Sequence, residues 1–167
     1  MNNVFKYSKG CLYWAERPES DFSSKRGHSL HLSRYAGKKA GNLGVCGYVQ
    51  VRYKGDLLYA HRVVWTMHHG DIPDGYEIDH INNKRDDNRI ENLRLVTSQQ
   101  NKFNMSKPRN NTSGYKGVSL YKGTGRYAAH IKVNGKKVHL GYFSTAEIAH
   151  EAYKEASLKY HGDHGKA

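Results

Sequence analysis

The sequence has few of the residues that would build a disulfide-linked or membrane-spanning protein. Its two cysteines, Cys11 and Cys46, are too few for a disulfide scaffold and lack the paired spacing of a zinc site, so we expect ordinary reduced thiols. No apolar run approaches the length of a membrane helix, and the N-terminal residues lack the continuous hydrophobic core of a secretory signal. These absences favour an intracellular protein, located in the cytoplasm.

Acidic residues are also scarce. The 167 residues include 27 Lys and Arg but 15 Asp and Glu, which gives a formal net charge of +12 and a pI near 9.7. The excess is spread along the chain, with 18 basic and 11 acidic residues in 1–111 and 9 and 4 in 112–167. Such a charge favours a polyanionic partner, with nucleic acid as the first candidate. The length allows one medium domain or two small ones.

The most informative stretch runs from residue 76 to residue 104. Residues 76–80 read as the end of a strand, and a polar, turn-prone loop follows. Residues 93–96 alternate apolar and polar, as in a second short strand. Thr97 and Gln100 then form a capping box that opens a helix. The order strand, loop, strand, helix predicts a small ββα unit.

Four polar residues of this unit have the chemistry needed to hydrolyse a phosphodiester. Asp79 offers a carboxylate and Asn101 an amide carbonyl, which are ligands suited to a hard divalent cation such as Mg²⁺. His80 points to the opposite side of an extended chain from Asp79, and its near-neutral pKa suits it to deprotonate an attacking water. Asn92 would either hydrogen-bond the backbone and fix the loop, or orient the imidazole of His80.

This pattern resembles the HNH endonuclease family, specifically the phage and intron-encoded homing endonucleases. The stretch that begins AHRVVWTMHHGDIPDGYEIDHINN at Ala60 is similar to the family's lead-in. The resemblance implies that His80 is the general base, that Asp79 and Asn101 are metal ligands, and that Asn92 is structural. It also implies a divalent metal cofactor, Mg²⁺ with Mn²⁺ as an alternative. An Asn rather than a His at position 101 resembles the homing branch more than the colicin-type branch.

The segment directly before this unit predicts a hairpin and a helix. Residues 48–60 predict a β-hairpin that turns at Lys54–Asp56, followed by a helix over 61–69 that stops at Gly70. We interpret His61 as a buried, hydrogen-bonded residue rather than a catalytic one, and Trp65 as part of the core.

Residues 1–45 are harder to interpret. Leu12–Trp14 could be a short strand. The basic run 20–44 is either a flexible loop or a segment that becomes ordered only on DNA. We expect His28 and His31 to be solvent-exposed or to contact phosphate.

The C-terminal third predicts a second compact unit. Residues 102–113 are polar and basic and are broken by Pro108, which indicates a linker. Three strands follow at 115–121, 126–133 and 137–143, and Ser144 with Glu147 would cap a helix. Alternation on the middle strand turns Tyr127, Ala129, Ile131 and Val133 toward that helix and leaves the opposite sheet face basic.

This second unit resembles the plant ethylene-response-factor (Apetala-type) DNA-binding domain. The resemblance lies in the YKGV opening, AAHIKVNGKK and LGYFSTAEIAHEAY. It implies that the exposed sheet face reads DNA, although Ser119, Tyr121 and His139 stand where plant members usually have Arg or Trp. The residues predicted to contact DNA on the sheet and the linker are Lys107, Arg109, Lys116, Ser119, Tyr121, Arg126, His130, Lys132 and His139.

Together these observations predict an α+β protein. A ββα-metal nuclease unit would follow a β-hairpin and a helix, and a C-terminal three-stranded antiparallel sheet would pack on one helix. The predicted domains are an N-terminal region and nuclease domain over 1–101, a basic linker over 102–113, and a DNA-binding domain over 114–167. The predicted function is site-specific, metal-dependent cleavage of double-stranded DNA by a monomer, with no obligate protein partner. The alternative is a DNA-binding regulator whose HNH unit is inactive.

Overall fold

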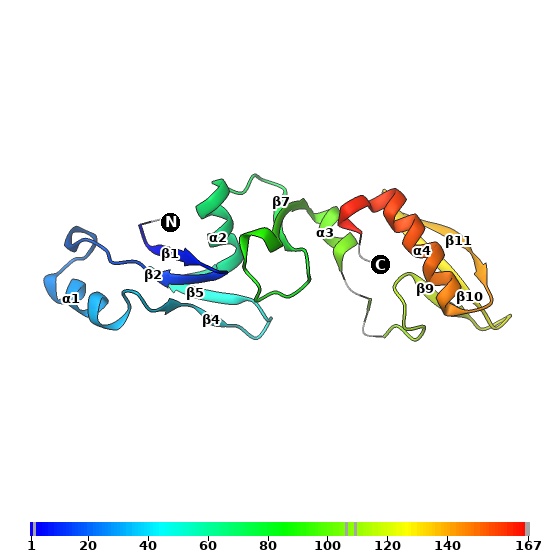
Figure 1. Cartoon of the computed structure of the whole chain (residues 1–167), viewed down its shortest axis with the longest axis horizontal. Coiled ribbons are helices and arrows are strands. Elements are labelled where there is room, and N and C mark those ends of the chain that lie inside the picture. The colour runs from blue at the N-terminus through cyan, green and yellow to red at the C-terminus, as the bar shows by residue number, and fades with distance from the viewer. Residues whose placement is uncertain (2, 106, 109, 166–167) are drawn as a thin grey trace. The chain divides into compact units, whose positions relative to one another are not determined.

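The structure is a computed structural model that describes residues 1, 3–105, 107–108 and 110–165. Helices and small sheets form two compact units, which we call the first unit (Met1–Val96) and the second unit (Thr97–Ala167) (Figure 1). The expected α+β class is confirmed, with three three-stranded sheets, one two-stranded sheet and four α-helices among the described residues. None of the described helices combines the length and apolar character needed to span a membrane.

The N-terminal residues are more ordered than the sequence predicts. Strands β1 (Phe5–Ser8), β2 (Cys11–Trp14) and β3 (Lys39–Ala40) form one sheet, and the short helix η1 (Glu19–Asp21) and helix α1 (Lys25–Arg34) lie between β2 and β3. Ser24 caps α1 by accepting a hydrogen bond from the Gly27 amide at 3.1 Å. Of the two alternatives for 20–44, the flexible loop is therefore wrong, because a cap and long-range contacts stabilise this helix. The other alternative, order gained only on DNA, stays a prediction.

His31 provides one of those contacts. It is 7% exposed, and its Nε2 lies 2.9 Å from the Ala15 carbonyl oxygen. The prediction of an exposed or phosphate-contacting His31 is thus incorrect. His28 is partly buried, with its ring centroid 5.4 Å from that of Phe22.

The predicted hairpin and helix of the first unit are both confirmed. Strands β4 (Asn42–Leu43), β5 (Val49–Tyr53) and β6 (Asp56–Tyr59) form the second sheet, and helix α2 (Ala60–His69) follows directly. The hairpin turns on Lys54 and Gly55, which both have positive φ, so the turn is one residue shorter than expected. The main core lies between the two sheets and α2 and includes Phe5, Val51 and Val64.

The central strands also lie where the alternation predicts them. Strand β7 (Tyr76–His80) pairs with β8 (Leu93–Thr97), and the short helix η2 (Ile90–Asn92) precedes β8. Ile78 and Leu93 are buried in the core. The loop between the strands is closed by a hydrogen bond from the Ile81 amide to the Asn92 carbonyl oxygen at 2.9 Å.

Helix α3 (Ser98–Asn104) belongs to the second unit and begins with the predicted capping box. Thr97 accepts a hydrogen bond from the Gln100 amide, and the Gln100 side chain accepts one from the Thr97 amide. The ring of Phe103 stacks on His161 with centroids 3.7 Å apart, and Lys116 Nζ donates to the Phe103 carbonyl oxygen at 2.6 Å. These contacts fasten α3 to the rest of the second unit.

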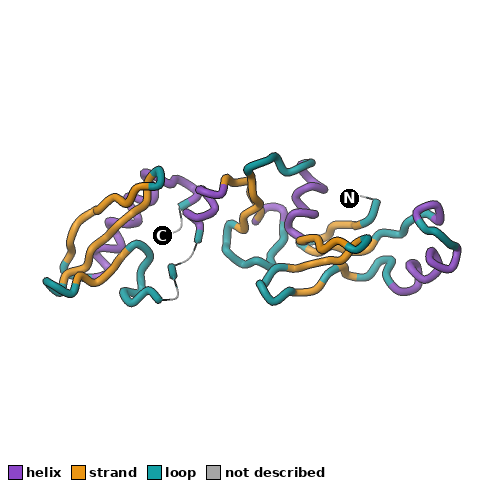
Figure 2. The backbone as a smooth tube through the Cα atoms, turned by 180° about the vertical axis from the view of Figure 1, so that it is seen from behind, coloured by secondary structure: helices purple, strands orange, loops and turns teal. Residues whose placement is uncertain are grey.

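The remainder of the second unit is a sheet packed on a helix, as predicted. Strands β9 (Val118–Tyr121), β10 (Arg126–Val133) and β11 (Lys136–Phe143) are antiparallel, and helix α4 (Ala146–His161) lies along one sheet face, followed by η3 (Gly162–His164) (Figures 1 and 2). Ala129 and Ile131 are buried toward α4. The helix is capped by Thr145 rather than Ser144, because Thr145 Oγ1 is the atom that accepts from the Ile148 amide.

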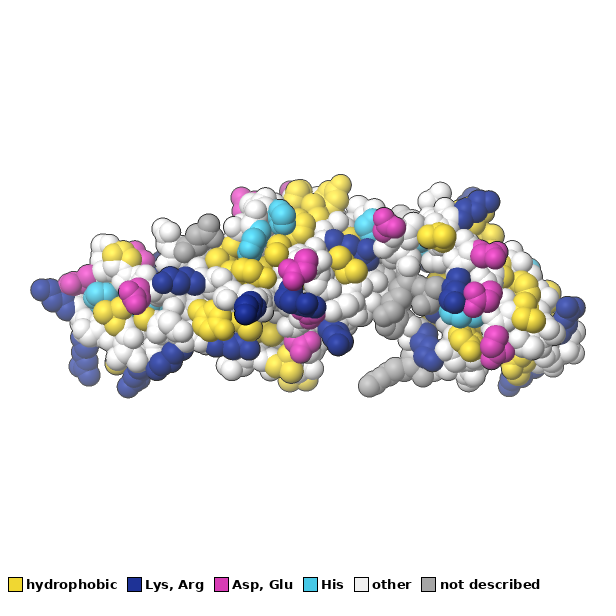
Figure 3. Space-filling view, in the orientation of Figure 1, with side chains coloured by type: hydrophobic (Ala, Val, Ile, Leu, Met, Phe, Trp, Pro, Cys, Tyr) yellow, Lys and Arg dark blue, Asp and Glu magenta, His cyan; other side chains and the backbone are white. Residues whose placement is uncertain are grey.

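The two faces of the second unit differ in charge. Residues 112–145 contain six Lys and Arg and no Asp or Glu. The exposed side of α4 carries Glu147, Glu151 and Glu155, one turn apart from each other. Figure 3 shows acidic side chains gathered over α4.

Candidate active site

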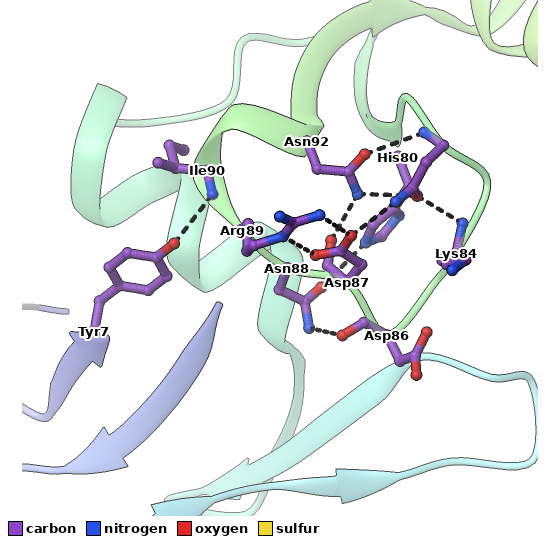
Figure 4. A network of polar contacts seen from close by, with 10 residues as sticks. Tyr7, His80, Lys84, Asp86, Asp87, Asn88, Arg89, Ile90 and Asn92 are labelled. Atoms are coloured by element: carbon purple, nitrogen blue, oxygen red, sulfur yellow. Dashed lines mark hydrogen bonds and ion pairs between the residues drawn. The ribbon is translucent and has the colours of Figure 1, made fainter. Parts of the chain in front are cut away.

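His80 ends β7 and is only 4% exposed. Its Nε2 lies 3.1 Å from Oδ1 of Asn88, which is 2% exposed (Figure 4). The Asn88 amide nitrogen donates to the Asp86 carbonyl oxygen at 3.3 Å, so the amide oxygen faces His80. Because that oxygen can only accept, the hydrogen of a neutral His80 ring lies on Nε2 and Nδ1 carries the lone pair. The imidazole is therefore held in the tautomer that can take a proton at Nδ1.

Asn92 fixes the loop that follows His80 (Figure 4). Its Oδ1 accepts from the Asn82 amide at 3.1 Å, and its Nδ2 donates to Asn82 Oδ1 at 3.1 Å and to the Asp87 carbonyl oxygen at 2.8 Å. Of the two roles considered for Asn92, these bonds correspond to fixing the loop. The side chain bound to the imidazole is Asn88, which the sequence analysis did not single out.

Further contacts hold the same loop. Arg89 donates to both carboxylate oxygens of Asp87, at 2.8 and 2.7 Å, and these hydrogen bonds hold the pKa of Asp87 well below its ordinary value. The hydroxyl of Tyr7, on β1, accepts from the Ile90 amide at 3.1 Å (Figure 4). The loop is thus tied both to itself and to the N-terminal sheet.

Asp79 lies one residue before His80 and is 8% exposed. Arg94 on β8 reaches its Oδ2 with both Nε and Nη2, each at 2.9 Å. A buried carboxylate needs such a partner, because desolvation without one is costly. The contact of Arg94 with Asp79 was not predicted, because in the sequence Arg94 reads only as the polar residue of an alternating strand.

His61 on α2 lies beside His80, with ring centroids 5.1 Å apart. It is 7% exposed, so the expected burial is confirmed. Its Nδ1 has no hydrogen-bond partner among the described residues, so the expected hydrogen bonding is not found at that atom. Its ring neighbours include Tyr48 and Tyr59. Burial, together with the charges of His80 and Arg62, lowers the pKa of His61 to about 3, which keeps this ring neutral.

The two predicted metal ligands belong to different units. Asp79 is in the first unit, and Asn101 lies on α3 in the second. The described part of the chain contains no group of three or more His, Cys, Asp or Glu residues arranged to hold a metal ion.

The predicted DNA-contacting residues fall into two groups. On the sheet face opposite α4, the exposed members are Ser119, Tyr121, Arg126, Lys132 and His139. His130 belongs to the same face, with its Nδ1 3.3 Å from that of His139, and partial burial near Lys137 and His139 lowers the pKa of His130.

The other predicted contacts lie off this face. Lys116 and Lys107 donate to backbone carbonyls, of Phe103 and Gly114 respectively. Arg109 is outside the described residues.

Comparison with known proteins assigns the central segment to a family. Residues 58–103 match the family model described as HNH endonuclease. This range includes α2, β7, β8 and most of α3, and therefore His61, Asp79, His80 and Asn88. This segment of the chain is thus similar to the HNH endonuclease family.

Relatives of known sequence cover different parts of the chain. Protein 3.8 of Escherichia phage T7 is 39% identical over 77 residues, which is 46% of this chain and 64% of that protein. The uncharacterized HNH endonuclease L560 of Acanthamoeba polyphaga mimivirus is 33% identical over 122 residues, which is 72% of this chain and 62% of that protein. APETALA2-like protein 2 of Oryza sativa subsp. indica is 47% identical over 55 residues, which is 33% of this chain and 13% of that protein.

The chain therefore spans less than two thirds of each of these relatives.

Among solved structures, one of the HNH homing endonuclease I-HmuI aligns with 94% of this chain and 84% of that chain. The sequence identity is 18% and the TM-score is 0.40.

Proposed function

We propose that the protein is a site-specific, metal-dependent DNA endonuclease of the homing type that acts as a monomer. The observation that carries this proposal is the buried His80, which Asn88 holds with Nδ1 as proton acceptor inside a segment that matches the HNH endonuclease model. An imidazole fixed in orientation by a hydrogen bond is suited to take a proton from a water molecule.

The reaction would proceed as follows. His80 Nδ1 takes a proton from a water molecule, whose oxygen forms a bond to the phosphorus of the scissile phosphodiester. The phosphorus–oxygen bond to the leaving group breaks, and the leaving oxygen takes a proton from solvent. Asn88 holds the protonated ring in the same orientation, because its Oδ1 still accepts from Nε2. Asn92 keeps the loop after His80 closed throughout.

Asp79 and Asn101 would each offer a hard divalent cation, Mg²⁺ or Mn²⁺, the kind of oxygen ligand that it prefers. Both residues present oxygen ligands, and Mg²⁺ takes one or two such ligands from protein together with water and phosphate. Arg94 also binds the Asp79 carboxylate, so a metal at this carboxylate would share it with the guanidinium. When bound, the metal would stabilise the charge that develops on the phosphate and the leaving oxygen.

The C-terminal sheet would hold the enzyme on its target. Its exposed face lies in a stretch of 34 residues (112–145) without an acidic side chain, and the similarity to an APETALA2-like protein supports a DNA-recognition domain over 114–167. A sheet can read base edges from the major groove. Arg126, Lys132 and His139 would be among the charged or polar contacts on this face, and the linker 102–113 would add backbone contacts.

A second candidate function is a DNA-binding regulator with an inactive HNH unit. The ion pair between Arg94 and Asp79 is the observation in its favour, because it engages the carboxylate that the metal would need.

Cleavage of supercoiled phage or host DNA, with Mg²⁺ or with EDTA, separates the two functions. We expect discrete nicked or linear products from the wild type with Mg²⁺ only, and a 10²- to 10⁴-fold lower rate for His80→Ala with binding retained. His69→Ala, a change to an exposed histidine on α2, is the matched control and should cleave normally. Tight, salt-sensitive binding without any product from the wild type would identify the regulator instead.

A further inference from the structure

The first unit contains a basic cleft that neither the HNH site nor the C-terminal sheet uses. It has a volume of about 490 Å³ and lies where the end of α1 meets strands β4 and β5. Its lining combines four cations with two aromatic rings and includes no Asp or Glu. These six residues are Trp14, Arg34, Tyr35, Lys38, Lys39 and Arg52.

The walls of this cleft are fixed by hydrogen bonds between residues that lie far apart in the sequence. The Trp14 amide donates to the Lys38 carbonyl oxygen at 2.9 Å, and the Gly37 amide donates to the Trp14 carbonyl oxygen at 2.8 Å. The buried His31 holds α1 against Ala15. The segment from α1 to β3 is therefore attached to β2 at several points. The backbone that carries its cations is held in place before any ligand binds, which lowers the entropic cost of binding.

The positive charge in the cleft is not neutralised by the protein. Within the described residues, no carboxylate forms a salt bridge with Arg34, Lys38, Lys39 or Arg52. All four side chains are exposed. Figure 3 shows Lys and Arg side chains projecting around the α1 end of the first unit. Such an arrangement attracts a polyanion.

The remaining lining favours nucleic acid over an anionic lipid surface. The site is concave, and Trp14 and Tyr35, with ring centroids 5.9 Å apart, offer aromatic surface to the sugars of a nucleic-acid backbone. Helix α1 is polar along most of its length, KRGHSLHLSR, and lacks the broad apolar face that inserts into lipid.

The position of the cleft indicates which part of the DNA it would contact. Within the first unit, α1 lies at the end opposite β7, which carries His80 (Figures 1 and 2). We propose that this cleft binds the sugar–phosphate backbone of duplex DNA outside the segment that is cleaved, so that its lining forms an additional recognition surface. This inference rests on the proposed function for its substrate, but binding alone can test it.

The test is the salt dependence of binding, measured by fluorescence anisotropy of the full chain with a labelled duplex that it binds. The cleft variant carries Arg34→Gln, Lys39→Gln and Arg52→Gln, which remove three charges and retain polar side chains. The slope of log K against log salt should fall by about 2.7, and affinity at low salt should fall at least about tenfold. The control variant carries Lys6→Gln, Lys25→Gln and Arg26→Gln, which remove three exposed charges of the same unit outside the cleft, and its slope should change much less.

Several outcomes would overturn the inference. One is an equal loss in the cleft and control variants when both retain the wild-type thermal midpoint. Another is unchanged DNA binding by the cleft variant together with lost binding to vesicles of equal parts phosphatidylserine and phosphatidylcholine. A wild type that binds DNA through the cleft but never cleaves it would refute the nuclease proposal and leave this inference standing. Normal cleavage with no contribution from the cleft would refute the inference alone.

Discussion

Arg94 binds Oδ2 of the Asp79 carboxylate with both Nε and Nη2, each at 2.9 Å. Neither side chain is more than 16% exposed, so the pair is largely shielded from water. The contact joins β8 to the end of β7 directly beside His80. It fixes the orientation of the Asp79 carboxylate.

Replacing Arg94 should therefore affect stability. Arg94→Met leaves the buried Asp79 carboxylate without its cation, and we expect the free energy of unfolding to fall by about 3–5 kcal/mol, as for other broken buried pairs. Urea denaturation at pH 7 measures this loss of unfolding free energy. The control is Arg89→Met, which breaks the more exposed pair with Asp87 and should have a much smaller effect. Equal losses in the two variants would show that burial of the Asp79 pair has no special importance.

Asn88 should determine how well His80 accepts a proton at Nδ1. Asn88→Leu removes the acceptor of His80 Nε2–H, and cleavage should slow by roughly tenfold or more, a fraction of what the base itself supplies. Asn88→Asp puts a carboxylate in the same place and favours the protonated imidazole, so the acid limb of the pH–rate profile should move to higher pH. A purely structural role would lower the thermal midpoint of both variants without moving that limb.

His61 should make the fold sensitive to acid. Its pKa is about 3 when folded and 6.5 when unfolded, so only the unfolded chain takes up this proton between those values. The contribution of the neutral His61 to the free energy of unfolding is complete above pH 6.5 and is lost progressively as the pH falls toward 3. Between pH 7 and pH 5 the wild type should lose about 2 kcal/mol more stability than His61→Phe. Urea titrations of the two proteins at both pH values measure the difference, and parallel losses would contradict this account.

Lys132 should contribute to DNA binding through charge alone. Lys132→Ala on the exposed sheet face should weaken binding similarly for all duplex sequences and lower the salt slope by about 0.9. Lys154→Ala removes a charge from the α4 side, where Lys154 pairs with Glu151, and serves as the control. A loss confined to one target sequence would instead assign Lys132 to base recognition.

The sequence predicted the features whose signals are local. Strand β7, strand β8 and the start of α3 follow from alternation and from the capping box of Thr97 and Gln100, which act over a few residues. The β-hairpin and α2 follow from a positive-φ turn and a terminal glycine in the same way. Helix α1 was missed because its sequence has little apolar periodicity and its stability comes from contacts such as His31 with Ala15, 16 residues apart.

The candidate site was predicted only in part for the same reason. His80 and Asp79 could be located by their residue types and spacing, but their roles remain predictions. Asn88 lies in the run Asp86–Arg89, which reads as an ordinary polar turn, and its bond to His80 depends on how that loop folds back. Arg94 and His61 lie on other elements, so their approach to Asp79 and His80 is a tertiary effect that periodicity does not report.

The uneven charge of the second unit has a kinetic consequence. An acid-free sheet region on one side and the glutamates of α4 on the other give this unit an uneven charge distribution, although Lys154 and Lys159 also lie on α4. In the field of a DNA duplex, the resulting torque would rotate the unit sheet-first during diffusional encounter. A larger fraction of collisions would then be productive, and the gain would shrink as added salt shortens the range of the field.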